Sequence, residues 1–238
     1  MRRNQPRRIA ALLFCTAVIG ATACGADDDA VTLSQGFCEA KATFDAVSPD
    51  TPDEAALRRY QGEAVPLLDR MGDEAPGQLT GAVSTWRDSI TEPRTLEEAS
   101  AAATDEKVSN AKALIGVSVH EQCGFEQAEF VVVDHAFQSA PESMQSGRTS
   151  LLLDNRGDAL HAIVVFRVND DVPDGEVLGL IGTDGLETRA AFVNAMPTDG
   201  GHKAALVIDL EPGRYIYFDD EHIDEMRGRF VVAGRSPG

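Results

Sequence analysis

Side chains that bind metal ions gather near the end of the chain, in the stretch YIYFDDEHIDEMRGRFVV at residues 215–232. This stretch holds one imidazole, one thioether and five carboxylates, and all three groups are metal ligands in proteins. The acidic side chains would also raise the local concentration of cations. No cysteine follows Cys123 in the chain. Any metal site here would therefore lack a thiolate ligand.

Two other stretches carry side chains with catalytic or metal-binding chemistry. Asp134-His135 has two of the residue types of a Ser-His-Asp arrangement. Neighbours in a strand point to opposite faces, so we expect a surface pair. Asn169-Asp170-Asp171 and Asp174-Gly175 are similar to part of a calcium loop. Val172, however, stands where an EF-hand needs Asp or Asn, and Ile181 stands where it needs Glu, so a solvated turn is predicted.

The remaining candidates point to structure rather than to catalysis. His120 and His202 lack partners at a recognisable spacing. Trp86 lies at helical spacing among apolar residues, which is typical of a core position. The chain carries no phosphate-loop or nucleophile-elbow motif. We therefore predict no catalytic residue.

The elements that would position a C-terminal site are β-strands, because hydrophobicity alternates with period two from Ala128 onward. Short β-rich runs such as EFVVVDHAF and LHAIVVFRV are separated by turn signals, among them Asn155-Arg156-Gly157 and Glu211-Pro212-Gly213. About six or seven strands predict a Greek-key β-sandwich over residues 128–236. The stretch from Asp170 to Thr198 is expected to interrupt it with a partly helical insertion.

Residues 32–125, by contrast, repeat apolar side chains at helical spacing. Thr51-Pro52-Asp53-Glu54 predicts a capping box with Pro at the first helical position, and Thr95-Leu96-Glu97-Glu98 repeats the pattern. Pro66 should kink or split the second helix, and Gly124 should cap the last one. The pattern indicates a bundle of about four helices. The predicted fold class is thus α+β multidomain, a helical bundle followed by a β-sandwich.

The sandwich resembles the cupredoxins in two motifs. DNRGDALHAIVVF, at 154–166, is similar to their first copper loop, in which an Asn and Gly turn precedes a ligand His that opens an apolar strand. His161 falls on that ligand position. The stretch 215–232 is similar to the second loop, in which Cys, His and Met lie in that order before the last strand. His222 and Met226 match the second His and the axial Met, whereas Asp219 stands where the family has its Cys.

The resemblance implies a cupredoxin-like fold, and Asp219 changes the chemistry that the fold could carry. A type 1 copper centre needs two imidazoles and a thiolate, so this chain cannot form one. The absence of that centre also argues against a function as an electron carrier. The remaining set of His161, His222 and Asp219, with Met226 nearby, suits Cu(II) or Zn(II). The alternative is a degenerate site without metal, in which the two histidines are hydrogen-bonded residues at one end of the sandwich.

The N-terminus has the pattern of an export signal. Four arginines precede a short apolar run and a small-residue exit, which predicts a signal peptide over residues 1–23. The exit, Ala21-Thr22-Ala23-Cys24, resembles the bacterial lipobox and implies that Cys24 becomes lipidated. The alternative is ordinary cleavage after the A-x-A pattern. Residues 24–31, with three successive aspartates, suit a solvated tether.

Cysteine usage predicts one disulfide. Cys15 leaves with the signal peptide and Cys24 is the anchor, which leaves Cys38 and Cys123 as a pair in an oxidising compartment. Their wide spacing favours a structural bridge over a redox-active one. The dipeptides Phe37-Cys38 and Cys123-Gly124 resemble a helical segment of secreted actinobacterial lipoproteins, and this resemblance implies no activity.

The net charge of the mature chain limits the classes of partner that it can bind. Removal of residues 1–23 leaves 17 basic residues of the original 21 against 39 acidic ones, a net charge of −22. Such a charge repels phosphate backbones, so nucleic acid is excluded as a partner.

We expect a lipoprotein anchored to the outer face of the cytoplasmic membrane. Its favoured role is a binding module for an extracytoplasmic protein or small ligand, without a bound cofactor. The alternative role is copper or zinc binding through the His161, Asp219, His222 and Met226 set. A metal-dependent enzyme would also need a substrate pocket, which no motif indicates.

Overall fold

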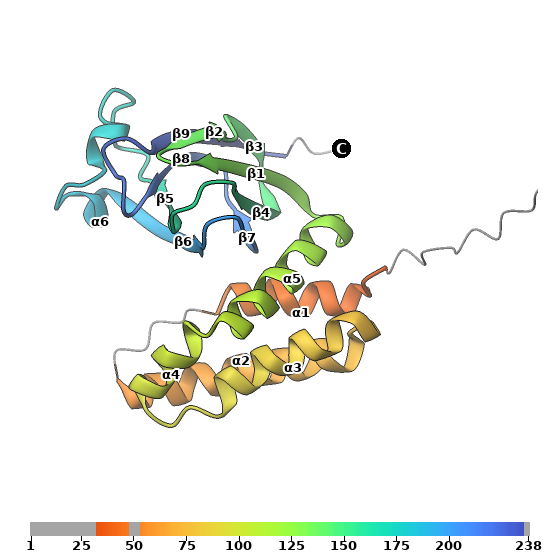
Figure 1. The fold of residues 1–238 in the computed structure, drawn as a ribbon. Helices are drawn as coiled ribbons and strands as arrows, with labels where there is room; N and C mark the ends of the chain where they lie inside the picture. The colour runs from red at the N-terminus through yellow and green to blue at the C-terminus, as the bar shows by residue number, and fades with distance from the viewer. Residues whose placement is uncertain (1–31, 48–52, 236–238) are drawn as a thin grey trace, which may run out of the picture. The chain divides into compact units, whose positions relative to one another are not determined.

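The structure is a computed structural model that describes residues 32–47 and 53–235 (Figure 1). Helices occupy the first half of these residues and strands the second, as predicted. The five helices of the first half are α1 (Gln35–Asp45), α2 (Glu54–Glu74), α3 (Gly77–Thr91), α4 (Leu96–Ala103) and α5 (Glu106–Gln122). This is one more than the sequence indicated, because α4 is a separate short helix. The predicted signal peptide, Cys24 and the tether lie outside the described residues.

Helix capping matches one prediction and corrects another. At α4, the Thr95 side chain accepts from the Glu98 backbone and the Glu98 side chain accepts from the Thr95 backbone, which is the predicted capping box. The prediction that α2 begins after Thr51 is wrong. Helix α2 begins at Glu54, and the Asp53 carboxylate caps it by accepting from Ala56 N at 2.7 Å. An ionised oxygen is the stronger cap, because charge-assisted hydrogen bonds are stronger than neutral ones.

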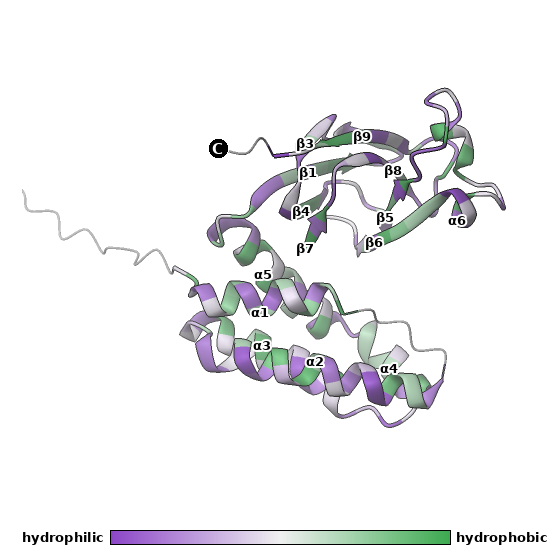
Figure 2. Ribbon diagram, turned by 180° about the vertical axis from the view of Figure 1, so that it is seen from behind, coloured by the Kyte–Doolittle hydropathy of each residue, from purple (hydrophilic) through white to green (hydrophobic). Residues whose placement is uncertain are grey.

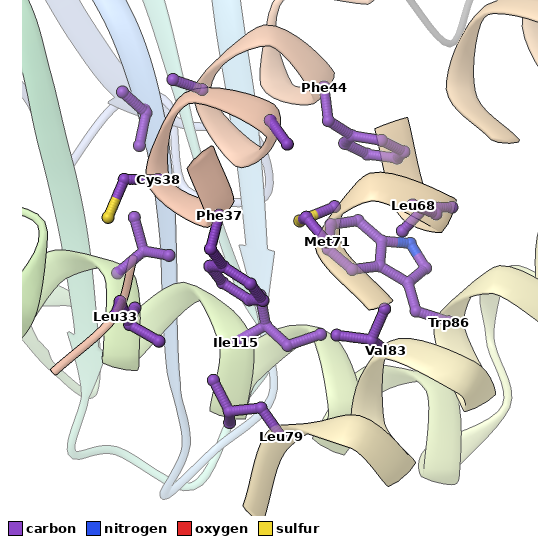
Figure 3. Packing of buried hydrophobic residues seen from close by; sticks show 14 of the residues in the cluster. Leu33, Phe37, Cys38, Phe44, Leu68, Met71, Leu79, Val83, Trp86 and Ile115 are labelled. Carbon is purple, nitrogen blue, oxygen red and sulfur yellow. The ribbon is translucent and has the colours of Figure 1, made fainter. Parts of the chain in front are cut away.

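Helix α2 also continues through Pro66, so the predicted split is absent. Apolar residues on both sides of the proline hold the helix against its neighbours. Ala64, Leu68 and Met71 are fully buried in the core of the bundle, which Figure 3 shows together with residues of α1, α3 and α5. Packing of this face stabilises the helix more than the one missing backbone hydrogen bond destabilises it. Along α2 and α3, hydrophilic and hydrophobic residues alternate at short intervals (Figure 2).

The predicted disulfide is confirmed. Cys38 lies in α1 and Cys123 is the C-cap of α5, with 5.6 Å between their Cα atoms. Gly124 follows with a φ of +68°, the left-handed conformation expected for a helix C-terminus. The bridge therefore joins the first and last helices of the bundle.

The second half is a mixed β-sandwich of two sheets. One sheet has the strand order β2-β1-β4-β7 and the other β3-β9-β8-β5-β6, and the pairs β1–β4 and β3–β9 are parallel. The strands are β1 (Glu126–Val133), β2 (Ala136–Ser139), β3 (Ser143–Gln145), β4 (Gly147–Asn155), β5 (His161–Val168), β6 (Ala190–Thr198), β7 (Lys203–Leu210), β8 (Gly213–Asp219) and β9 (Arg227–Ala233). The predicted fold class is thus confirmed.

The insertion expected between Asp170 and Thr198 is helical only in part, as η1 (Val177–Leu180) and α6 (Leu186–Arg189). Its last nine residues form β6, which pairs with the whole length of β5. Val172, Val177 and Leu180 of the insertion are buried in a cluster on β5 residues Phe166 and Val168. Strand β5 is therefore apolar on both faces, because a sandwich core covers one and the insertion covers the other.

Residues of the helices and of β7 pack directly against each other within the compact unit from Thr32 to Gly238. Val207 of β7 belongs to the core cluster of the bundle, and its backbone N donates to Asp45 Oδ2 at 2.7 Å. A Cβ placed on Gly116 of α5 would lie 2.5 Å from the Ala205 carbonyl oxygen. Only glycine allows this approach of helix to strand. In the described ranges, no helix is long and apolar enough to cross a membrane.

Candidate metal site

The ends of two neighbouring strands place the candidate residues. His161 is the first residue of β5 and Asp219 is the last residue of β8, and these strands pair antiparallel with Ile163 opposite Asp219. The turn before β5 is held by Asn155, whose Nδ2 donates to the carbonyl oxygens of Ala159 at 2.8 Å and Thr198 at 3.0 Å. The predicted Asn and Gly turn thus orients the start of β5. His222 and Met226 lie in the segment between β8 and β9.

Asp219 is the centre of a hydrogen-bond network. Its side chain is fully buried. Oδ2 accepts from Ala162 N at 3.0 Å and lies 3.1 Å from His161 Nδ1. Oδ1 accepts from the backbone N of Glu221 and of His222, both at 3.0 Å, and lies 3.0 Å from His222 Nδ1. With both imidazoles protonated at Nδ1, five donors surround one carboxylate.

The structure brings three of the four predicted ligands together. His161, Asp219 and His222 each offer one ligand atom, and these atoms all lie within 4.8 Å of one another. Around a tetrahedral Zn(II) with bonds of about 2.0–2.1 Å, neighbouring ligand atoms are about 3.3 Å apart. Each imidazole lies near that spacing from a different oxygen of Asp219, His222 Nδ1 at 3.0 Å from Oδ1 and His161 Nδ1 at 3.1 Å from Oδ2. A shared ion would need the two imidazoles to approach each other by at most about 1.5 Å.

The fourth predicted ligand, Met226, is fully buried in the apolar cluster between the sheets. Its backbone holds the loop, because Asp219 N donates to the Met226 carbonyl oxygen and Met226 N donates to the His222 carbonyl oxygen, both at 2.8 Å. These bonds close the segment from 219 to 226 into a compact turn. Met226 thus supports the position of His222 through the backbone.

The two imidazoles differ in exposure. His161 is fully buried and the side chain of His222 is 24% exposed, so any ion or partner would approach from the His222 side. His161 Nε2 has no hydrogen-bond partner within the described part of the chain. A metal-bound imidazole normally donates its second N–H to an acceptor. Metal at Nδ1 would leave an unpaired Nε2–H, and the metal-free tautomer leaves an unpaired Nε2 lone pair. The unpaired Nε2 of His161 therefore favours neither the metal-bound nor the metal-free form of the site.

His135 lies beside the candidate site, which its sequence pattern did not indicate. Its ring lies 4.3 Å from the ring of His222, between ring centroids, and the side chain is exposed. The expected surface position of Asp134-His135 is correct, but the expected strand is wrong. The two residues form the turn between β1 and β2, and Asp134 has a φ of +51°. The signal was the residue type, since Asp tolerates the left-handed conformation of tight turns.

The stretch with partial calcium-loop character holds a guanidinium in place of an ion. Arg214 of β8 donates to the Val172 carbonyl oxygen at 2.6 Å and to Asp174 Oδ1 at 2.7 Å. It also donates to the carbonyl oxygens of Asn169 at 2.9 Å and Asp170 at 3.2 Å. The guanidinium uses the oxygens that a cation would need. The predicted solvated turn is therefore tied down by a side chain from another strand.

Two further histidines and the tryptophan have structural positions. His120 Nδ1 lies 3.0 Å from Ser150 Oγ, which links α5 to β4, and burial lowers the pKa of His120. His202 is exposed, with Nδ1 2.8 Å from the Gly200 carbonyl oxygen. Trp86 is buried in the bundle core, as predicted.

No protein-family model matches the chain, and no curated protein matches it. Among solved structures, the sandwich is similar to auracyanin B, with 17% identity and a TM-score of 0.34 over 45% of this chain and 88% of that one. It is also similar to auracyanin from Roseiflexus castenholzii, with 20% identity and a TM-score of 0.34 over 45% of this chain and 96% of that one. A multicopper oxidase from Aquifex aeolicus matches with 11% identity and a TM-score of 0.30, over 46% of this chain and 29% of that one. At these values, the likeness says nothing about the site.

The chain combines a disulfide-tied helical bundle with a mixed β-sandwich. Its distinguishing feature is a buried aspartate between two imidazoles, at the end where the strands β5 and β8 meet. The donor set does not fit a type 1 copper centre, because it has no thiolate. It fits a borderline divalent ion, for which imidazole and carboxylate are suitable ligands.

Proposed function

We propose that this protein binds Cu(II) or Zn(II) at His161, Asp219 and His222, as a lipoprotein held outside the cytoplasm through Cys24. One observation carries the proposal: one ligand atom from each of the three side chains lies within 4.8 Å of the others. Two of these residues are fully buried, and the third opens to solvent. An ion could therefore enter from solvent at His222 and bind in the buried, low-dielectric position beside His161 and Asp219.

The donor set and its surroundings select among ions. Imidazole and carboxylate suit Cu(II) and Zn(II), and Cu(II) forms the stronger complexes with a given set of nitrogen and oxygen ligands. Cu(I) prefers soft ligands, and no cysteine follows Cys123, which is held in the disulfide. Asp220, Glu221, Asp224 and Glu225 are exposed around the loop and attract cations.

Metal would have to replace hydrogen bonds that already exist. Both Nδ1 atoms would give up their protons to Nε2, and Asp219 would exchange two imidazole donors for the ion. The three backbone donors to Asp219 can stay in place, since a carboxylate oxygen accepts a hydrogen bond and coordinates metal at the same time. Affinity should fall in acid, because protons compete for the imidazole nitrogens.

Calorimetric titration of chelator-treated protein with Cu(II) and Zn(II) tests the proposal. The double variant His161→Ala/His222→Ala should lose stoichiometric binding. His202→Ala is the matched control, because the exposed side chain of this histidine bonds only to the Gly200 carbonyl within residues 32–47 and 53–235. The bound Cu(II) should give an EPR spectrum without strong thiolate character. Equal binding by the double variant and the parent would contradict the proposal.

A second function is favoured by the completeness of the Asp219 network. Five donors hold the carboxylate without an ion, as a scaffold would need. In that case, the sandwich acts as an interaction module for an extracytoplasmic protein or small ligand. The same titration separates the two functions. Absence of any binding above the double variant, together with an unchanged fold, would support the module.

A further inference from the structure

A cleft of about 740 Å³ lies between the helices and the sandwich, and its lining reaches Leu160 and Thr198, which adjoin His161 along the chain and across the β5–β6 ladder. Its walls come from α1, α5, β6 and β7, with the ring of Trp86 and the half-exposed Leu160 among its apolar residues. Gly116 lets α5 approach the backbone of β7 closely at Ala205, which lines the cleft. Ligand sites of small molecules have volumes of about 300–1,000 Å³ and are mostly apolar with a few polar groups.

Lysine is concentrated in this cleft. The chain has only four lysines, and three of them, Lys41, Lys112 and Lys203, line the cleft. The fourth, Lys107, is exposed on α5 and does not line it. In a chain with 39 acidic residues, such a grouping of ammonium groups is the place where an anion would be attracted rather than repelled.

Two of the three lysines already have carboxylate partners. Lys41 is buried and forms an ion pair with Asp45, which also accepts from Val207 N. Lys203 Nζ lies 3.3 Å from Asp154 Oδ2. Lys112 differs, because it has no hydrogen bond or ion pair with any residue that the structure describes. It is half-buried, and burial alone lowers the pKa of its ammonium group.

A second polar group in the cleft is also unpaired. Thr198 lines the cleft and is 5% exposed, and its Oγ1 is buried with no hydrogen-bond partner among the residues described. Buried hydroxyls almost always have a partner, because an unpaired one costs about 1–3 kcal/mol. Lys112 and Thr198 come from different elements, α5 and β6, and both line the same space.

We infer that this cleft binds a small organic acid, with its carboxylate on the Lys112 ammonium group and its apolar body against Trp86 and Leu160. The Thr198 hydroxyl supplies a further hydrogen bond to the bound acid. Three carboxylates also line the cleft. Asp45 is paired with Lys41, and Glu106 and Asp199 are exposed, so solvent screens their repulsion. The site shares no side chain with the metal site, although Thr198 lies opposite His161 in the β5–β6 ladder.

Trp86 provides the assay, because it is the only tryptophan of the chain and lines the cleft. Its fluorescence is followed during titration of the whole protein with hexanoate, hexan-1-ol and hexylamine at constant ionic strength. These probes share an apolar chain and differ in charge. Hexanoate should bind about tenfold more tightly than hexan-1-ol, the low end of what a charge-assisted hydrogen bond contributes. Hexylamine should bind most weakly of the three.

Two lysine variants localise the effect. Lys112→Met should lower the affinity for hexanoate about tenfold, to that for hexan-1-ol, and leave the affinity for hexan-1-ol unchanged. Lys107→Met, the matched control on the same helix, should change neither. Lys112→Gln serves if the methionine variant does not fold, and Thr198→Val should weaken hexanoate by a smaller factor.

Three results would overturn the inference. Hexanoate could give no saturable change in Trp86 fluorescence, or it could bind no more tightly than hexan-1-ol. Lys107→Met could also weaken hexanoate as much as Lys112→Met does, which would reduce the effect to the overall charge of the protein. Each result can be read from the parent protein and two variants whose folding is checked by circular dichroism.

Discussion

Replacement of Asp219 by asparagine should destabilise the protein strongly, although the side chain keeps its shape. The carboxylate accepts five hydrogen bonds in a fully buried position. In Asp219→Asn, one oxygen becomes an NH2 group, which can face either set of donors. His161 can change its tautomer and accept from that amide. The backbone N–H groups cannot change, so at least one of them would meet another donor.

The magnitude follows from the network. If the NH2 group replaces Oδ2, Ala162 N loses its acceptor, which costs about 1–3 kcal/mol for a buried donor. The three donors on Oδ1 then bond to a neutral oxygen, and each neutral bond is weaker than a charged one by about 1 kcal/mol. Lower desolvation of the neutral side chain offsets part of this loss. We expect the free energy of unfolding to fall by about 2–4 kcal/mol.

Urea denaturation of chelator-treated protein measures the change as a shift in midpoint at constant slope. Asp220→Asn is the matched control. It makes the same change at the next residue, whose carboxylate is exposed and unpaired in the described structure, and it should alter stability by less than about 0.5 kcal/mol. A loss in Asp219→Asn no larger than in the control would show that the carboxylate does not hold the two loops together.

Three further predictions follow from the described contacts. Asp219→Cys should restore a His₂Cys set, so added Cu(II) should give an intense visible thiolate-to-copper absorption, and a colourless complex would refute the assigned geometry. Removal of the bridge in Cys38→Ala/Cys123→Ala should lower the free energy of unfolding by about 2–5 kcal/mol in urea, and a change below about 1 kcal/mol would contradict a role in stability. Burial lowers the folded-state pKa of His120 below its ordinary 6.5. The stability linked to this group is therefore complete above pH 6.5 and lost as pH falls through the lowered pKa. His120→Asn should reduce the acid-side slope of stability, and an unchanged slope would exclude this origin.

Local patterns predicted the frame of the site because its parts are short-range. Asn155 and Gly157 form a turn through their own side-chain and backbone contact, Gly157 N to Asn155 Oδ1 at 3.1 Å. That turn leads directly into β5 and His161. The strand β8, the loop with His222 and the strand β9 are likewise consecutive in sequence. Period-two alternation and turn residues act over a few positions, so they can be read without a partner.

Other features escaped prediction because they depend on contacts between distant segments. Arg214 lies 40 residues after the loop that it fills, as its bond to Asp174 shows. Strand β6 forms because its backbone pairs with that of β5. The sequence of β6 includes a proline and suggested an insertion rather than a strand. His135 meets His222 across 87 residues, between two turns. Pairing across such separations depends on register and closure of the sheets, which no local pattern specifies.

The sequence by itself determined the order of a helical and a β-rich half, the disulfide between Cys38 and Cys123, and the absence of the thiolate that a type 1 copper centre requires. These depend on residue type and on spacing over a few positions. Only the tertiary structure decided that Asp219 lies between the two imidazoles with five donors around it, and that three of the four lysines line one cleft. Those arrangements arise when strands β5 and β8 pair and α5 packs on β7, which brings together side chains that are far apart in sequence.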